Sequence, residues 1–354
     1  MSDFEKYLTQ GEPEQKEKGY IWQTAIGLQD VDGLKPSDYL IENAKQNIEG
    51  NITIKEVKYR LDSYYKQNPV KNHDDRTEEA DKVSARIAEI LSEKTFTFSP
   101  IEYINIHKRL FEEIYEFAGK IRDYNISKAE WVLNGESVLY ASAHNLRDAL
   151  EYDFKEEKNF SYRDLNNQEK VEHIAKFISN IWQAHVFGEG NTRTTAVFAI
   201  KYLRTFGFEV NDDMFAEKSY YFRNSLVRAN YNNFKHNTYA TNEHLNKFFF
   251  NLLLGEKNEL KSRKLRIDNI ENDTNAGVNA GVNAGVKLTK NELNIIELIK
   301  KNNHISQSEI AKKIKINEST VFRNIAKLKA LGIIFREGSD KTGKWIIKNA
   351  FTLL

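Results

Sequence analysis

The sequence HVFGEGNTRTTAVF, residues 185–198, gathers residue types that can act on a phosphate group. A turn through residues 188–190, followed by a helix that begins near Arg193, would direct several unpaired backbone N–H groups at one point. Such helix starts bind phosphate, because their first amides lack partners and the helix dipole favours an anion there. Arg193 in the first turn opposes that dipole, and an anionic ligand would offset the cost. The pattern therefore predicts an anion site.

Two side chains in this stretch add chemistry to the anion site. His185 can accept a proton from an attacking hydroxyl near neutral pH. Glu189 can supply one carboxylate to Mg²⁺, which commonly takes one or two carboxylates and completes its shell with water and substrate phosphates. Taken singly, the histidine has an ordinary structural interpretation, the glycine-rich segment is an ordinary turn, and Asn191 is a plain helix cap. The combination carries the prediction.

The same stretch resembles the active-site motif of Fic-domain proteins, H-x-F-x-(D/E)-G-N-G-R-x-x-R. Of the eight specified positions, six match and two differ. The matching residues are His185, Phe187, Glu189, Gly190, Asn191 and Arg193. Thr192 replaces the usual glycine, and Ala196 replaces the second arginine. The resemblance extends over roughly residues 20–255 and implies a mainly α fold with a Fic-type helical core.

The resemblance implies an enzyme, a protein adenylyltransferase that moves AMP from ATP to a Ser, Thr or Tyr hydroxyl of a target protein, the chain itself included. His185 would deprotonate the hydroxyl, Mg²⁺ on Glu189 would neutralise the phosphates, and Asn191 and Arg193 would hold them. Phe187 would point into the core and set the loop. The expected nucleotide-binding residues are Gly188, Gly190, Asn191, Thr192, Arg193, Arg223, Asn224 and Arg228. The last three have an equally ordinary interpretation as polar residues on a solvated helix face.

The two departures from the motif bear on the nucleotide. In Fic enzymes the second arginine grips the γ-phosphate, and Ala196 removes it. Thr192 adds a β-branched side chain where bare backbone usually meets phosphate. Two alternatives follow: another cation, such as Arg223 or Arg228, replaces the missing arginine, or the enzyme uses a different nucleotide donor.

The segment EWVLNGESVLY, residues 130–140, predicts a β-hairpin, because Asn-Gly between two β-prone runs is a strong hairpin signal. It resembles the Fic flap, which holds the target segment by strand addition. The expected docking residues are Trp131, Val132, Leu133, Val138 and Leu139. The alternative is a surface hairpin that merely connects helices.

Residues 22–61 resemble the small antitoxin that is fused to or paired with some Fic proteins. Its inhibitory helix carries (S/T)-x-x-x-E-(G/N), and the glutamate binds the second motif arginine. Here Thr24 is kept, but Leu28 and Gln29 stand at the last two positions. Acid and arginine are both absent, so autoinhibition by this route is expected to be lost or replaced. The alternative is a helical cap on the core. We assign residues 1–66 to this segment and 67–270 to the catalytic domain.

Residues 271–287 repeat Asn-Ala-Gly-Val three times and contain nothing large to bury, which predicts a flexible linker. The charge changes across this segment. Lys287 to Lys348 hold 14 Lys and Arg against 6 Asp and Glu, a net charge of +8, although the whole chain has a net charge of only +1. The two parts are therefore expected to have different partners.

Residues 288–354 resemble a winged helix-turn-helix domain. An amphipathic helix comes first, Ser306 and Glu309 form a capping box before the next helix, and two β-prone runs follow a third. The expected DNA-contacting residues are Arg323, Lys327, Arg336 and Lys344. The alternative is a protein-docking or dimerisation module.

Composition narrows the remaining choices. The chain has no cysteine, which excludes disulfides, thiolate metal sites and cysteine nucleophiles. The charged start and the lack of a long apolar run favour a cytoplasmic protein with no membrane contact. A target protein with an acceptor hydroxyl is the expected partner, with DNA and a second copy of the chain left open. The competing function is a DNA-binding regulator whose Fic-like domain binds nucleotide without transferring it.

Overall fold

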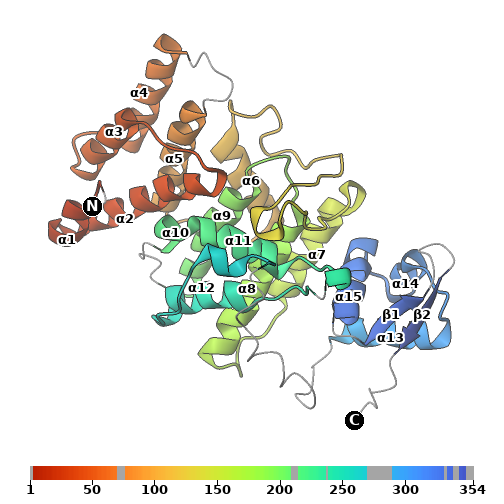
Figure 1. Ribbon diagram of the computed structural model, residues 1–354. Helices are drawn as coiled ribbons and strands as arrows, with labels where there is room; N and C mark the ends of the chain where they lie inside the picture. The colour runs from red at the N-terminus through yellow and green to blue at the C-terminus, as the bar shows by residue number, and fades with distance from the viewer. Residues whose placement is uncertain are drawn as a thin grey trace.

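The computed structural model describes residues 3–69, 76–208, 214–236, 238–268, 289–330, 333–337 and 343–347. Within these ranges the chain is mainly helical, as the apolar spacing predicts, and forms two bodies with separate hydrophobic cores (Figure 1). The expected linker at 271–287 lies outside the described residues. No described helix combines the length and apolarity needed to cross a membrane.

The larger body is built from twelve described α-helices. Their bounds are α1 Glu5–Gln10, α2 Pro13–Gly27, α3 Asp38–Ile48, α4 Ile54–Gln67, α5 Thr77–Ser92, α6 Pro100–Phe111, α7 Leu146–Lys158, α8 Asn167–Ala184, α9 Asn191–Thr205, α10 Met214–Glu217, α11 Ser219–Ala229 and α12 Glu243–Leu254. Short 3-10 turns lie at Leu28–Asp32, Trp131–Leu133, Ala143–Asn145, Phe234–His236 and Ser262–Leu265. Capping boxes begin α4 and α8, at Thr53 and Asn166.

One core joins the N-terminal helices to the helices that carry the motif. Trp22, Leu40 and Leu61 of α2, α3 and α4 belong to the same buried cluster as Phe187 and Phe198. Helix α2 packs on α5, and α5 in turn packs on α9. The 3-10 turn after α2 also contacts α9. The N-terminal segment therefore reaches the helix that begins at the motif.

The smaller body has the element order expected of a winged helix. Its helices are α13 Lys290–Lys301, α14 Gln307–Ile314 and α15 Glu318–Ala330, followed by strands β1 Ile334–Glu337 and β2 Lys344–Ile347. Ser306 and Glu309 form the expected capping box, and β1 and β2 pair antiparallel with Ile334 opposite Ile347. Helix α15 lies beside α7 of the larger body (Figure 1).

The hairpin expected at 130–140 is the part of the fold prediction that is wrong. The turn does form, with Asn134 and Gly135 at positive φ, but the flanking residues form a 3-10 turn and extended loops rather than paired strands. Val132 and Leu133 are both fully buried. Neighbouring residues of a strand face opposite sides, so one sheet face could not bury both, whereas a tight helical turn can.

Candidate active site

The motif lies in a short loop between helices α8 and α9, and each end of the loop has a residue with a left-handed backbone conformation. Helix α8 ends at Ala184 and is followed by His185, which has φ of 50°; α9 begins at Asn191 after Gly190, which has φ of 74°. The helix starts two residues earlier than the sequence pattern indicated. Its unpaired N-terminal amides therefore follow directly on Glu189 and Gly190.

Gly190 has both a conformational and a packing requirement. A Cβ added there would lie 2.4 Å from the Phe111 ring, on a backbone that side chains rarely adopt. Gly190→Ala is expected to destabilise the fold by about 1–3 kcal/mol, because overpacking a core has that cost. Thermal unfolding of the variant beside Gly207→Ala, which also has positive φ but open space around its Cβ, separates the clash from the backbone strain. Equal stability losses in the two variants would contradict the packing argument.

Asn191 and His107 hold the loop in place. The Asn191 amide donates to the Phe187 carbonyl oxygen (2.8 Å) and accepts from the Phe187 N–H (3.0 Å). His107 Nδ1 accepts from the Gly119 N–H, so its Nε2 donates to the Glu189 carbonyl oxygen at 3.0 Å. The His107 ring stacks on Phe187 with centroids 3.7 Å apart, and burial lowers its pKa to about 4. His107 is therefore neutral at pH 7.

His185 has the chemical state that a general base needs. Both ring nitrogens are buried, and neither has a hydrogen-bond partner in the described part of the chain. Burial, and after it the positive charge of Lys128, holds the pKa of His185 well below its usual range. The ring lies against Tyr140 with centroids 4.0 Å apart. A neutral imidazole without a partner is free to accept a proton.

Arg122 fixes the backbone of His185. Its Nε donates to the His185 carbonyl oxygen at 2.7 Å, and its other nitrogens donate to the carbonyl oxygens of Tyr124, Ala141 and Ala184. Arg122 thereby connects the end of α8 to Tyr124 and Ala141, which lie on either side of the segment predicted as a hairpin. Sequence reasoning missed this residue, since an isolated arginine outside the motif gives no signal.

Glu189, the expected metal ligand, is held by a lysine. Lys128 Nζ lies 3.1 Å and 3.0 Å from the two carboxylate oxygens. Burial would raise the pKa of Glu189, but the Lys128 ammonium leaves it below its usual value, so the group is a carboxylate. No cluster of three or more His, Cys, Asp or Glu side chains suited to a metal occurs among the described residues. One carboxylate is still compatible with Mg²⁺, because substrate phosphates commonly supply further ligands.

Arg193 is fully buried and is occupied by other protein groups. Its Nε lies 2.9 Å from Asp32 Oδ2, its Nη2 lies 2.7 Å from Glu79 Oε1, and its Nη1 donates to Gln29 Oε1 at 3.0 Å. The guanidinium also lies over the Phe111 ring, 4.8 Å from its centroid. Two of these partners, Gln29 and Asp32, come from the 3-10 turn that follows α2.

This contact changes the interpretation of the N-terminal segment. The sequence lacks an acid at Leu28, where the antitoxin motif has one, but Asp32 lies one turn further on and reaches an arginine of the motif. That arginine is Arg193, the first of the family pattern. The position of the second, Ala196, is fully buried in the hydrophobic core, and Thr24 is also buried. The N-terminal segment therefore does pair an acid with an arginine of the motif, but the pair is Asp32 with Arg193 rather than the glutamate and second arginine of the family pattern.

The cavity at the motif is almost closed. It has a volume of about 10 Å³ and is lined by Asp32, Lys128, Glu130, Trp182, His185, Glu189, Asn191, Thr192 and Arg223. A single water needs about that much space, so a nucleotide does not fit until side chains move. Three carboxylates against two cations also line it, a balance that disfavours a triphosphate.

Only some of the other residues predicted to bind the nucleotide line this cavity. Arg223 lines the cavity, where Nη2 pairs with Glu130 Oε2 at 2.9 Å. Asn224 is fully buried, with both amide atoms unpartnered in the described chain. Arg228 does not line the cavity. Thr192 accepts a hydrogen bond from Trp182 Nε1 at 3.0 Å, and Gly188 lies against the Tyr124 hydroxyl.

The five expected target-docking residues divide between core and surface. Val132, Leu133 and Val138 are buried, so they do not present a face to another protein, whereas Trp131 and Leu139 are exposed. Trp131 packs under the Arg266 guanidinium, which lies 5.0 Å from its ring centroid. The backbone beside Leu139 is engaged too, because its carbonyl oxygen accepts from Gln183.

Comparison with known families agrees with the predicted Fic domain and with the predicted winged helix-turn-helix domain. Residues 97–203 match the model of the Fic/DOC family, and residues 288–334 match the model described as winged helix-turn-helix DNA-binding. Neither match reaches helices α1–α5, so the antitoxin-like nature of residues 22–61 stays a prediction. No curated protein matches the chain. The chain therefore carries a Fic/DOC domain and, after it, a winged helix-turn-helix domain.

Proposed function

We propose that the protein is an adenylyltransferase that moves AMP from ATP to a side-chain hydroxyl of a protein, and that its winged helix binds DNA. The observation that carries the proposal is the state of His185. It is neutral, lacks a hydrogen-bond partner among the described residues, and lines the same cavity as Glu189 and the start of α9. A protein that only sensed a nucleotide would need no such base.

The proposed roles follow from position. His185 accepts the proton of the target hydroxyl, which makes the oxygen a better nucleophile. The oxygen forms a bond to the α-phosphate while the bond between the α- and β-phosphates breaks, and pyrophosphate leaves. Arg122 donates to the backbone carbonyl oxygen of His185, and the Tyr140 ring lies against its imidazole, so both residues keep the side chain in place. The first amides of α9 face the developing charge on the phosphate. Asn191 acts indirectly, by holding the loop, because its side-chain oxygen and nitrogen are both hydrogen-bonded to the Phe187 backbone.

Glu189 is the residue that would hold Mg²⁺ together with the phosphates. When bound, the metal would neutralise phosphate charge. Lys128 must then leave Glu189, and its ammonium would be released close to the incoming phosphates. Arg193 can meet a phosphate only after Asp32 moves away. The structure is therefore that of a closed site, which opens before nucleotide enters.

The depressed pKa of His185 predicts the pH dependence of transfer. A base acts in its neutral form, which predominates above its pKa. Since that pKa lies well below the usual histidine value, kcat/KM is expected to stay level from pH 8 through pH 6.5 and to fall only at lower pH. The measurement is initial rate against pH under limiting ATP. A decline centred near pH 6.5 would show that the histidine has an ordinary pKa.

The second candidate is a DNA-binding regulator with a nucleotide-binding Fic domain that does not transfer. The pairing of Arg193 with Asp32 and Glu79 favours it, as does the lack of a cation at Ala196. A transferase that uses another nucleotide donor is a variant of the first proposal. The paired state of Arg193 and the lack of a cation at Ala196 both affect which phosphates the site can bind.

Mass spectrometry of acceptor proteins distinguishes these possibilities. The protein is incubated with Mg²⁺ and ATP, alone and with a cell lysate, and modified peptides are sequenced. The proposal predicts an AMP group on a Ser, Thr or Tyr oxygen. A different nucleotide group on the same kind of oxygen would show that the enzyme uses a donor other than ATP. No modification in either sample, despite measurable nucleotide binding, would favour the regulator.

A further inference from the structure

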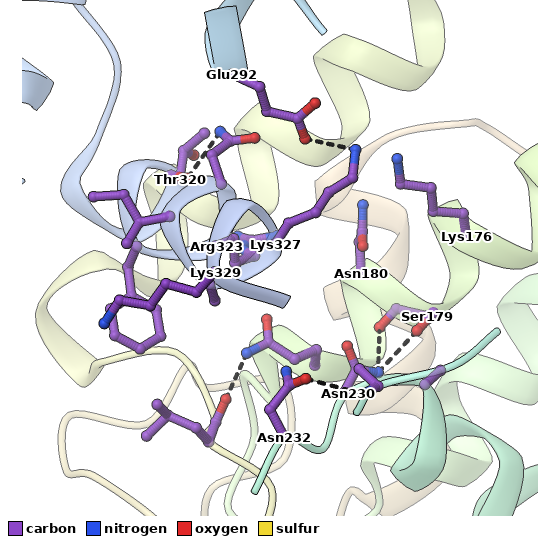
Figure 2. A pocket seen from close by; sticks show the side chains of 18 of the residues that line it. Lys176, Ser179, Asn180, Asn230, Asn232, Glu292, Thr320, Arg323, Lys327 and Lys329 are labelled. Carbon is purple, nitrogen blue, oxygen red and sulfur yellow. Dashed lines mark hydrogen bonds and ion pairs between the residues drawn. The ribbon is translucent and has the colours of Figure 1, made fainter. Parts of the chain in front are cut away.

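The face of the winged helix that would meet DNA is turned toward the Fic/DOC domain. Helix α15 is the third helix of the winged domain, the position of the recognition helix in helix-turn-helix proteins. It packs on α7, and the two domains enclose a cavity of about 1310 Å³ lined by Thr320, Arg323 and Lys327 of α15. Figure 2 shows the Lys327 side chain on the same side of α15 as Lys176 and Asn180 of α8.

A carboxylate of the Fic/DOC domain forms an ion pair with Arg323, which lies near the middle of helix α15. Arg323 Nη1 donates to both oxygens of Asp153 on α7, at 2.8 Å and 2.6 Å. Asp153 is 4% exposed, and its burial raises its pKa although Arg323 counteracts the rise. The carboxylate thus pairs with a cation that the sequence predicts to contact DNA. Asn291 of α13 donates to the Tyr152 hydroxyl on the same helix, at 2.7 Å.

The other cations predicted to meet DNA are also engaged within the protein. Lys327 lies 2.6 Å from Glu292 (Figure 2), and Lys344 lies 3.0 Å from Glu337. Arg336 lies over the Trp345 ring, 4.7 Å from its centroid. Arg323 is the member of this set whose partner belongs to the other domain.

The docked face contains buried polar groups that make no hydrogen bond within the described residues. Arg323 Nε and Nη2 and the Thr320 hydroxyl are buried, and none has a hydrogen-bond partner in the described residues. Unsatisfied buried donors cost free energy. Lys176 also points toward Lys327 (Figure 2), and desolvation and the Lys327 charge together lower its pKa. Phosphate oxygens could satisfy the Arg323 and Thr320 groups of α15, and separation of the domains would relieve the repulsion between Lys176 and Lys327.

We propose that helix α7 competes with duplex DNA for the recognition helix α15, so that the docked arrangement is the DNA-free form. The inference rests on the proposed DNA binding by the winged helix. Asp153 acts as an intramolecular substitute for a phosphate, and binding of DNA separates the two domains. Because coupling between two equilibria is reciprocal, any change that separates the domains also strengthens DNA binding.

The first test measures affinity for a fluorescent pool of random-sequence DNA duplexes at low salt, where phosphate contacts are strong. Asp153→Asn in the full chain is expected to bind about 10-fold more tightly than the natural sequence. Glu151→Gln removes an exposed carboxylate from the same helix and is the matched control for overall charge. Equal gains in both variants, or none in Asp153→Asn, would overturn the proposal.

The second test needs no change in the core. Since the chain has no cysteine, spin labels can be attached to Lys158→Cys on α7 and Lys301→Cys on α13, both exposed. Saturating DNA is expected to lengthen the distance between the labels. DNA binding at an unchanged distance would overturn the competition and leave DNA binding intact. If neither the natural chain nor Asp153→Asn binds DNA, the DNA-binding function itself fails, and this inference with it.

Discussion

Replacing His185 with alanine is expected to slow AMP transfer about 10²- to 10⁴-fold, the range that a general base contributes. The physical reason is that no other described side chain in the cavity can take the proton equally well. Glu189 is paired with Lys128, Asp32 with Arg193, and Glu130 with Arg223. Nucleotide affinity is expected to change little, since the imidazole acts on the acceptor hydroxyl. Single-turnover transfer and calorimetric binding of ATP measure the two effects separately.

His144→Ala is the matched control, because His144 is exposed and lies away from the cavity. It is expected to keep the full rate. The account of His185 as the base is wrong if its alanine variant transfers AMP at the natural rate. It is also wrong if transfer and ATP affinity fall by the same factor, since that pattern indicates damage to the binding site.

Removing the carboxylate of Asp32 is expected to strengthen ATP binding by a factor on the order of 100, about 2.7 kcal/mol. A phosphate that approaches Arg193 must displace this acid, and breaking a buried ion pair typically costs about 3–5 kcal/mol. In Asp32→Ala the nucleotide no longer meets that cost, and Glu79 still keeps Arg193 from being buried without a partner. Calorimetric titration with ATP and Mg²⁺ gives the affinity.

Two further variants define the cause of this effect. Asp30→Ala removes an exposed acid from the same turn, so it reports the effect of charge alone and is expected to leave affinity unchanged. Asp32→Ala combined with Arg193→Ala should lose the gain, because the freed cation is gone. If Asp32→Ala binds ATP no better than Asp30→Ala, the N-terminal segment does not restrict the site through this pair.

Local patterns in the sequence predicted the winged helix and the motif loop well, for a physical reason. Capping at Ser306, helix periodicity and the turn at Gly190 depend on residues that are close in the chain. Phe187 also lies in the core, as expected. In the described structure, the local signals and the tertiary packing agree at these positions.

The hairpin prediction failed because packing overrode a local signal. Asn134 and Gly135 do adopt positive φ, but the demand to bury both Val132 and Leu133 selects a 3-10 turn. Strand propensity depends on the surroundings of each side chain, and a run of residues does not reveal which of them will be buried.

Long-range partners account for the rest of what the sequence did not predict. Asp32 lies far from Arg193 in the chain, and Asp153 lies far from Arg323. Arg122 and Lys128 precede the segment predicted as a hairpin, at positions where the sequence pattern carries no signal. His107 had a detectable signal, a histidine on the apolar face of α6, but that signal does not say what the ring will hold.

The most direct test of the central claim follows transfer of label from each α-³²P nucleoside triphosphate, with Mg²⁺, to protein. The natural chain, Asp32→Ala and the double variant Asp32→Ala/His185→Ala are compared. The account predicts label from ATP that increases in Asp32→Ala and disappears in the double variant. Nucleotide bound by Asp32→Ala without label on any protein, even after addition of a lysate, would contradict it and leave the DNA-binding regulator as the function.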